Sequence, residues 1–200
     1  MLNRPLDLTM VLHIRFLEVE GKKRFILDAG VQDSKCDKIS VYTQDGFLIL
    51  SVIDHIGLEQ TVKATASDLV IGFNTLLFEL KKDLNNSILA IYCNNRIIAS
   101  TEVPYPIIFN NNPIEENYFV GSDVAGKNNG EFEVSEQIIF AKTLNVKEKS
   151  EIDEYLRKKH SPQPKGAIRF TNGAFLYRDK VHKGLIQNNI MSRPKYLSNE

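Results

Sequence analysis

Residues 131–160, EFEVSEQIIFAKTLNVKEKSEIDEYLRKKH, change their pattern of apolar residues in the middle. The first part alternates apolar and polar residues, which predicts a half-buried β-strand. The second part predicts an amphipathic helix that begins at Asn145, because Asn145 and Glu148 have the spacing of a capping box. The basic turn RKKH suits the C-terminal end of that helix, and the prolines of SPQP then stop it. The predicted apolar stripe of the helix consists of Ile152, Tyr155 and Leu156.

The residues before this stretch predict one strand after another. Asp45 and Gly46 stand between two β-rich runs and predict the tight turn of a hairpin. We expect about ten strands at a spacing of about 8–12 residues, which is typical of two packed antiparallel sheets. The predicted strands fall in residues 6–19, 24–30, 38–52 (the hairpin), 59–66, 74–82, 87–94, 95–103, 117–123 and 131–140. The fold class is therefore all-β: a two-sheet antiparallel jelly-roll sandwich with one short C-terminal helix and an appended hairpin tail.

The charges divide the chain into two parts. The whole sequence has 25 basic and 25 acidic residues, and residues 161–200 hold seven of the basic and two of the acidic ones. Residues 1–160 therefore hold 18 basic and 23 acidic residues. We expect a jelly-roll domain over residues 1–160 and a basic tail over residues 161–200. The net charge of zero argues against a generic nucleic-acid binder, so no nucleic-acid partner is expected.

The tail contains a hairpin signal. The run KGAIRFTNGAFLYRD, residues 165–179, is centred on Asn172 and Gly173, a strong two-residue turn signal. We expect this hairpin to pair with an open sheet edge, or to link the domain to another subunit or domain. Its basic and aromatic residues suit docking on the acidic domain. The predicted interaction residues are Arg169, Phe170, Phe175, Tyr177 and Arg178.

The sequence is compatible with more than one cellular location and with either state of its two cysteines. No apolar run approaches the roughly 18 residues of a membrane span, and charged residues interrupt the N-terminus where a secretory signal would need an apolar run. The chain is therefore either intracellular or virion-borne, or an excised domain of a larger extracellular surface protein. Cys36 and Cys93 lie outside any metal-binding pattern and are either two free thiols or one disulfide. The four histidines, His13, His55, His160 and His182, have no partners at ligand spacing, so no zinc site is expected.

The stretch 136–160 resembles the C-terminal end of the laminin-G-like, concanavalin A-like lectin and glucanase domains. In that superfamily a strand that begins with Glu leads to a Leu and then to a capped helix, as Glu136–Phe140, Leu144 and the predicted helix do here. Residues 6–30 and 38–52 look like the strands that open such domains, and ILAIYCNNRII, residues 88–98, resembles a further strand–turn element. The resemblance covers residues 5–160 in order. It implies a jelly-roll fold and a role in recognising a carbohydrate or a protein surface.

Glycoside hydrolysis is the enzymatic use of this fold. It requires two carboxylates on one face of a strand, and the related glucanases carry them in an ExDxxE strand. Glu131 and Glu133 share a face here, but in a regular strand Glu136 points to the other one. The acidic run Glu151, Asp153 and Glu154 lies on the predicted helix, where it is a solvated face. No catalytic residue is predicted, and the chain is not expected to be an enzyme.

Loops contain the residue types that bind sugars, which are aromatic rings beside amides or carboxylates. The predicted ligand-binding residues are Tyr105, Phe109, Asn110, Asn111, Asn112, Tyr118, Asp123 and Asn128. The alternative is that the three aromatic residues pack under the loops. Asp123, Asn128 and Asn129 are also candidates for a calcium site, since calcium prefers oxygen ligands; the alternative is that they only form turns. No other cofactor is expected.

These observations favour a non-catalytic recognition module that binds carbohydrate or a protein surface. The alternative is a structural or assembly module of a virion or of a larger surface protein, which would form oligomers or contact a neighbouring domain through residues 161–200. A glycoside hydrolase is the least favoured of the three.

Overall fold

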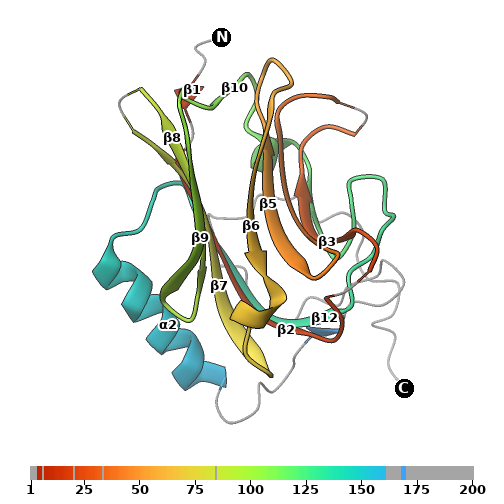
Figure 1. Cartoon of the computed structure of the whole chain (residues 1–200), viewed down its shortest axis with the longest axis vertical. Helices are drawn as coiled ribbons and strands as arrows, with labels where there is room; N and C mark the ends of the chain where they lie inside the picture. Colours follow the sequence, from red (N-terminus) through yellow and green to blue (C-terminus); the bar gives the residue numbers. More distant parts are fainter. Residues whose placement is uncertain are drawn as a thin grey trace.

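The computed structural model describes residues 7–19, 21–32, 34–83 and 85–160, and the backbone of residues 4–5 and 168–169. Two antiparallel sheets pack face to face in this part of the chain (Figure 1). One sheet has the strand order β11-β3-β4-β5-β6, and the other has the order β13-β12-β2-β7-β8-β9. The two-sheet antiparallel sandwich predicted from the sequence is therefore confirmed.

The strands of the five-stranded sheet are β3 (Arg24–Ala29), β4 (Lys38–Gln44), β5 (Phe47–Ile53), β6 (Glu59–Thr65) and β11 (Tyr118–Val120). Those of the six-stranded sheet are β2 (Leu8–Phe16), β7 (Phe73–Lys82), β8 (Ser87–Cys93), β9 (Arg96–Val103), β12 (Phe132–Phe140) and β13 (Ile168–Arg169). The short strands β1 (Arg4–Pro5) and β10 (Ile108–Phe109) pair with each other. The helical elements are the 3-10 turn η1 (Ala66–Asp68), α1 (Pro113–Glu116) and α2 (Val146–His160).

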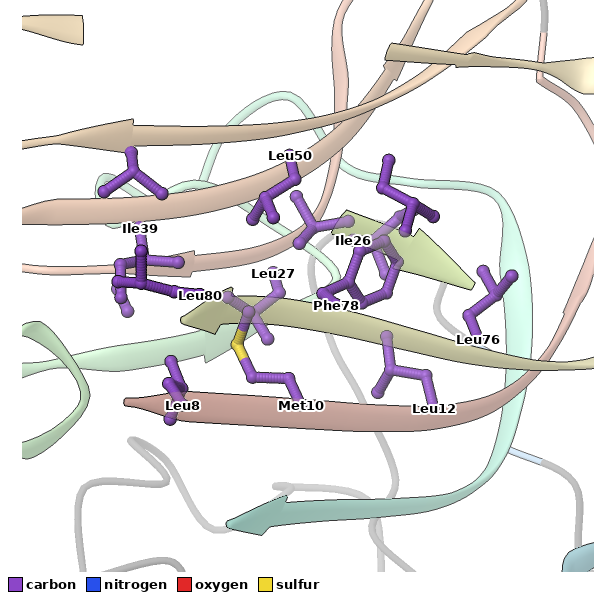
Figure 2. Close-up of a cluster of buried hydrophobic side chains, with 14 of the residues drawn as sticks. Leu8, Met10, Leu12, Ile26, Leu27, Ile39, Leu50, Leu76, Phe78 and Leu80 are labelled. Atoms are coloured by element: carbon purple, nitrogen blue, oxygen red, sulfur yellow. The ribbon is translucent and has the colours of Figure 1, made fainter. Parts of the chain in front are cut away.

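The main core lies between the two sheets. Figure 2 shows leucine and methionine side chains of β2 meeting residues of β3, β4 and β5 across this space. Alternate residues of β2, such as Met10 and Leu12, are completely buried here, as the period-two pattern predicts. Phe78 of β7 is completely buried in the same cluster. Burial of these side chains is the main stabilising contribution to the sandwich.

A second apolar layer lies on the opposite face of the six-stranded sheet. Helix α2 packs there, on the side away from β5 and β6 (Figure 1). Leu156 of the helix is completely buried against Val11 of β2 and Leu77 of β7. The predicted capping box is confirmed: the Glu148 amide donates to Asn145 Oδ1 at 2.9 Å, and the Asn145 amide donates to Glu148 Oε2 at 2.8 Å.

One residue of the predicted helix stripe is misplaced. Tyr155 is 40% exposed, whereas Lys149 and Asp153 are buried together with Leu156. Residues 149, 153 and 156 lie on one face because they are spaced by four and three positions. Lys149 Nζ lies 2.7 Å from Oε2 of Glu79, a buried carboxylate of the sheet. This ion pair allows a charged residue to lie on the buried face of the helix, where the sequence predicted apolar ones.

Strand β12 contains a β-bulge that changes the predicted direction of Glu136. The pairing of β12 with β2 shifts register between Val134 and Glu136. Because the bulge inserts one extra residue, Glu136 pairs with His13 and points to the same face as Glu133. The prediction that Glu136 points to the opposite face is therefore wrong.

The tight turn predicted at Asp45 and Gly46 is confirmed, and a second hairpin turn has a similar backbone conformation. Asp45 and Gly46 have positive φ angles of 51° and 79°, and so do Asn94 and Asn95, at 50° and 63°. In the tail, Ile168–Arg169 pairs antiparallel with β12, with Arg169 opposite Glu133. The other predicted tail residues, and the turn at Asn172 and Gly173, lie outside the described residues.

Both cysteines are free thiols, Cys93 in the core and Cys36 half-buried in a loop. Burial raises the pKa of Cys93 to about 11. None of the helices among the described residues is both long enough and apolar enough to cross a membrane.

Candidate functional site

The three aromatic residues predicted to bind a sugar pack inward. Phe109 and Tyr118 are each only 4% exposed and belong to the main core. Tyr105 is half-buried against the same core, and its hydroxyl accepts a hydrogen bond from Gln60 Nε2 at 2.7 Å. Rings buried in this way cannot offer a face for stacking, so the structure favours the packing alternative for Phe109 and Tyr118.

The asparagine run between β10 and α1 has mainly local contacts. Asn112 caps α1, because its Oδ1 accepts a hydrogen bond from the Ile114 amide at 3.1 Å. The Asn110 amide donates to Asp37 Oδ1 at 3.0 Å. Asn110 and Asn111 are exposed, so their side chains remain accessible, but the structure brings no exposed aromatic ring of the predicted set beside them.

Asp123 organises the loop of residues 121–130. Its Oδ1 accepts hydrogen bonds from the amides of Ala125 and Lys127, at 3.1 and 2.7 Å. Its Oδ2 accepts one from the Asn128 side-chain amide at 2.7 Å. A calcium ion at this carboxylate would have to displace these donors, since donor and cation compete for the same lone pairs. Calcium binding by Asp123, Asn128 and Asn129 stays a prediction.

A different set of polar side chains gathers on the outer face of the five-stranded sheet, which points away from the core. The registers of neighbouring strands place Asp28, Ser40, Ser51 and Thr61 in one row across β3, β4, β5 and β6. Tyr42, Ile49 and Lys63 form the next row, and Lys38, Ile53 and Glu59 form the row on the other side. We call this surface, together with Lys23 from the segment before β3, the polar face.

Hydrogen bonds hold the side chains of the polar face in place. Ser40 Oγ donates to Asp28 Oδ1, and the Val124 amide donates to Asp28 Oδ2 at 2.9 Å. On the next strands Ser51 Oγ donates to Glu59 Oε1 at 2.6 Å. Asp28 is only 2% exposed, and burial raises the pKa of its carboxyl despite these hydrogen bonds. Ser51 therefore fixes the orientation of the exposed Glu59 carboxylate on β6, whereas the Asp28 carboxylate, three strands away on β3, is buried.

Lys23 lies over two aromatic rings of this face. Its Nζ is 3.8 Å from the ring centroid of Tyr42 and 4.7 Å from that of Phe25. Burial lowers the pKa of Lys23, while the carboxylates of Glu59 and Asp28 act in the opposite direction. The pKa of Tyr42 is raised, first by burial and then by Glu59. Shifted pKa values in one cluster of side chains are a feature of functional sites, although structural ion pairs produce them too.

The sequence analysis missed the polar face. The signal was present in the strand patterns, because Ser40 and Ser51 interrupt the apolar runs of the 38–52 hairpin at outward positions. Only the pairing register shows that these serines lie side by side and next to Asp28. The sequence therefore shows these serines as polar exceptions in apolar strands, but it does not show that they form one cluster.

A second polar cluster lies on the outer face of the six-stranded sheet, at the end of α2. Glu136 accepts hydrogen bonds from His160 Nε2 at 2.8 Å and from Tyr155 Oη at 3.2 Å, and pairs with Lys159 at 3.0 Å. Burial would raise the pKa of Glu136, but these partners outweigh burial and lower it. Glu133 on the same face is paired with Arg15. A glycosidase needs one carboxyl that stays protonated, which this paired arrangement of Glu136 does not provide.

The described residues contain no group of three or more His, Cys, Asp or Glu side chains placed to hold a metal ion. The contacts of the second cluster join α2 to the sheet, and we interpret it as structural.

No protein-family model matches the chain, and no curated protein is similar to it in sequence. Solved structures do share its fold. The binding domain of botulinum neurotoxin serotype G has a TM-score of 0.56 at 13% identity, over 79% of this chain and 38% of that one. The CBM40 domain of a Ruminococcus gnavus IT-sialidase, bound to alpha2,3 sialyllactose, has a TM-score of 0.54 at 14% identity, over 74% of this chain and 83% of that one. A NanB sialidase variant from Streptococcus pneumoniae has a TM-score of 0.59 at 19% identity, over 74% of this chain and 24% of that one.

At these identities the likeness concerns the fold. The chain is a β-sandwich, and it spans well under half of the toxin domain and of the sialidase chain.

Proposed function

We propose that this chain is a non-catalytic carbohydrate-binding module and that its ligand lies on the polar face. The observation that carries the proposal is a pair of accessible charged side chains on this face: Glu59, oriented by Ser51, and Lys23, which lies over Tyr42; Asp28, Ser40 and Ser51 are themselves buried. Sugars present hydroxyl groups in fixed directions, and side chains already oriented by hydrogen bonds bind them at a low entropic cost.

Two further points support this proposal. The CBM40 domain with a similar fold is itself bound to a sialylated sugar. The finer resemblance to laminin-G-like and concanavalin A-like domains, stated from the sequence, also implies carbohydrate recognition. Within the polar face Glu59 is exposed and oriented by Ser51, and Lys23 is half-exposed, so these two side chains are the ones we expect to contact the ligand.

The test is binding of the full chain to a panel of neutral and sialylated glycans, followed by the same assay on variants. We expect Lys23→Met and Glu59→Gln each to lower the affinity about ten-fold, the effect of losing one hydrogen bond to a charged group. Lys81→Met, which removes an exposed lysine of the other sheet, is the matched control and should bind normally. Binding that both site variants retain would place the ligand elsewhere on the molecule.

One observation favours assembly as a second candidate function. Ile168–Arg169 of the tail pairs with the edge of the six-stranded sheet, so this short element is able to supply the same strand to a second copy. If no glycan binds, removing residues 161–200 tests this alternative: an assembly module should change from oligomer to monomer in size-exclusion chromatography. If the full chain and the chain without residues 161–200 are both monomeric, the assembly function is refuted.

A further inference from the structure

We infer that the ligand is an extended glycan of several sugar units, and that Phe47 provides a stacking platform for one of them at the end of the polar face. This inference rests on the proposed function and adds a second contact region to it.

Phe47 is an exposed aromatic residue on the same outward face. It is the first residue of β5 and lies two residues from Ile49, so both side chains point away from the core. The ring is 40% exposed. Its neighbours in register are Gln44 on β4 and Thr65 on β6. An accessible ring with an amide on one side and a hydroxyl on the other matches a pyranose, which has an apolar C–H face and a rim of hydroxyl groups.

The platform is held rigidly by the turn before it. The Asp45 amide donates to the carbonyl oxygen of Gly21 at 2.9 Å, and the carbonyl oxygen of Gly46 accepts from the Ala66 amide at 2.8 Å. These contacts join the β4–β5 turn to two neighbouring segments. A ring on a fixed backbone loses little freedom when a ligand stacks on it, which favours binding.

The length of the site sets the ligand class. Phe47 and Ile53, the outward residues at the two ends of β5, are six residue steps apart, about 20 Å. Ile49 and Ser51 between them are buried, so a ligand along this span would contact exposed side chains of β6 such as Lys63. Glu59 is paired with Ile53 at one end, and Phe47 lies at the other. Lys63 is paired with Ile49 between them. A single sugar ring is far shorter than this span, so a ligand that contacts both Phe47 and Glu59 is a chain of several units.

The experiment is calorimetric titration of the full chain with cello-, xylo- and manno-oligosaccharides of two to six units, and with sialyllactose as a probe for recognition of a terminal sugar. We expect the affinity for one of the series to rise about ten-fold between the shortest and the longest member. Phe47→Ala should remove that rise and leave the affinity for the shortest member unchanged. Phe47→Tyr, which keeps the ring, should preserve the rise.

The outcomes separate this inference from the proposed function. If sialyllactose or the shortest oligosaccharide binds as tightly as any longer chain, the extended ligand is refuted and the proposed function stands. A length dependence that Phe47→Ala leaves intact refutes the platform. If no glycan of any length or type binds, the proposed function itself fails. Because Phe47 is at the surface, both variants should fold, and unchanged thermal unfolding would confirm that.

Discussion

The imidazole rings of His13 and His160 stack, with their centroids 5.0 Å apart. His13 comes from β2 and is 5% exposed, while His160 is the last residue of α2. Phe73 stacks on the His13 ring, also at 5.0 Å. The end of α2 is therefore joined to the six-stranded sheet through a stacked pair of imidazole rings.

This contact predicts a loss of stability on acidification. Burial, and next the charge of His160, lower the pKa of His13 from 6.5 to about 4. A lowered pKa means that the folded protein binds fewer protons than the unfolded chain, so the stabilisation is complete above pH 6.5 and is lost as the pH falls towards 4. We expect the free energy of unfolding to fall by roughly 2–3 kcal/mol over this range, measured by urea denaturation.

His13→Phe keeps a stacked ring and removes the titrating group, so its unfolding free energy should depend less on pH. Lys147→Gln, at an exposed position of α2, is the control for the change in charge. An unchanged pH dependence in His13→Phe would contradict the role given to this residue.

The buried ion pair below α2 predicts a large effect of one substitution. Lys149 Nζ lies 2.7 Å from Glu79 Oε2, and the two side chains are only 9% and 6% exposed. Lys149→Met leaves the Glu79 carboxylate buried without a cation, which should lower the free energy of unfolding by about 3–5 kcal/mol. The double variant Lys149→Met with Glu79→Gln should recover part of the loss. Lys147→Met, where the side chain is 85% exposed, should change it by less than about 0.5 kcal/mol.

The loop of residues 121–130 allows a test of calcium. The three donors on the Asp123 carboxylate predict that millimolar calcium leaves the midpoint of thermal unfolding unchanged. Asp123→Ala should lower the free energy of unfolding by roughly 1–3 kcal/mol, because three hydrogen bonds are lost. A rise of several degrees with calcium that Asp123→Ala abolishes would instead identify a cation site, as the sequence suggested.

Gly130 is a position where the backbone approaches the core too closely for a side chain. An added Cβ would lie 2.1 Å from Phe132 Cε1 and 2.7 Å from the carbonyl oxygen of Phe25. Gly130→Ala should therefore move the Phe132 ring and lower the free energy of unfolding by about 1–3 kcal/mol, measured by thermal or urea unfolding. Lys127→Ala, in the exposed part of the same loop, is the control. Equal stability of both variants would mean that the core adapts without cost.

Some features of the candidate site could not be foreseen from the sequence. Phe109 and Tyr118 are aromatic residues of the type that stacks on sugars, but in the structure they pack in the main core. In the sequence, Phe47 is simply the first residue after a predicted turn. The strand register shows that its neighbours on the sheet are Gln44 and Thr65, and the structure leaves its ring exposed. Local sequence describes which residue types are present, whereas burial depends on what packs above each of them.

The sequence by itself determined the local elements of this protein. Period-two alternation placed the strands, positive-φ turn residues at Asp45 and Gly46 placed a hairpin, and the Asn145–Glu148 capping box placed the start of α2, because each of these depends on residues a few positions apart. Tertiary structure alone decided the direction of Glu136 and the composition of the polar face. A bulge inserts a residue that alternation cannot reveal, and a row such as Asp28, Ser40 and Ser51 exists only once the register between strands distant in the sequence is fixed.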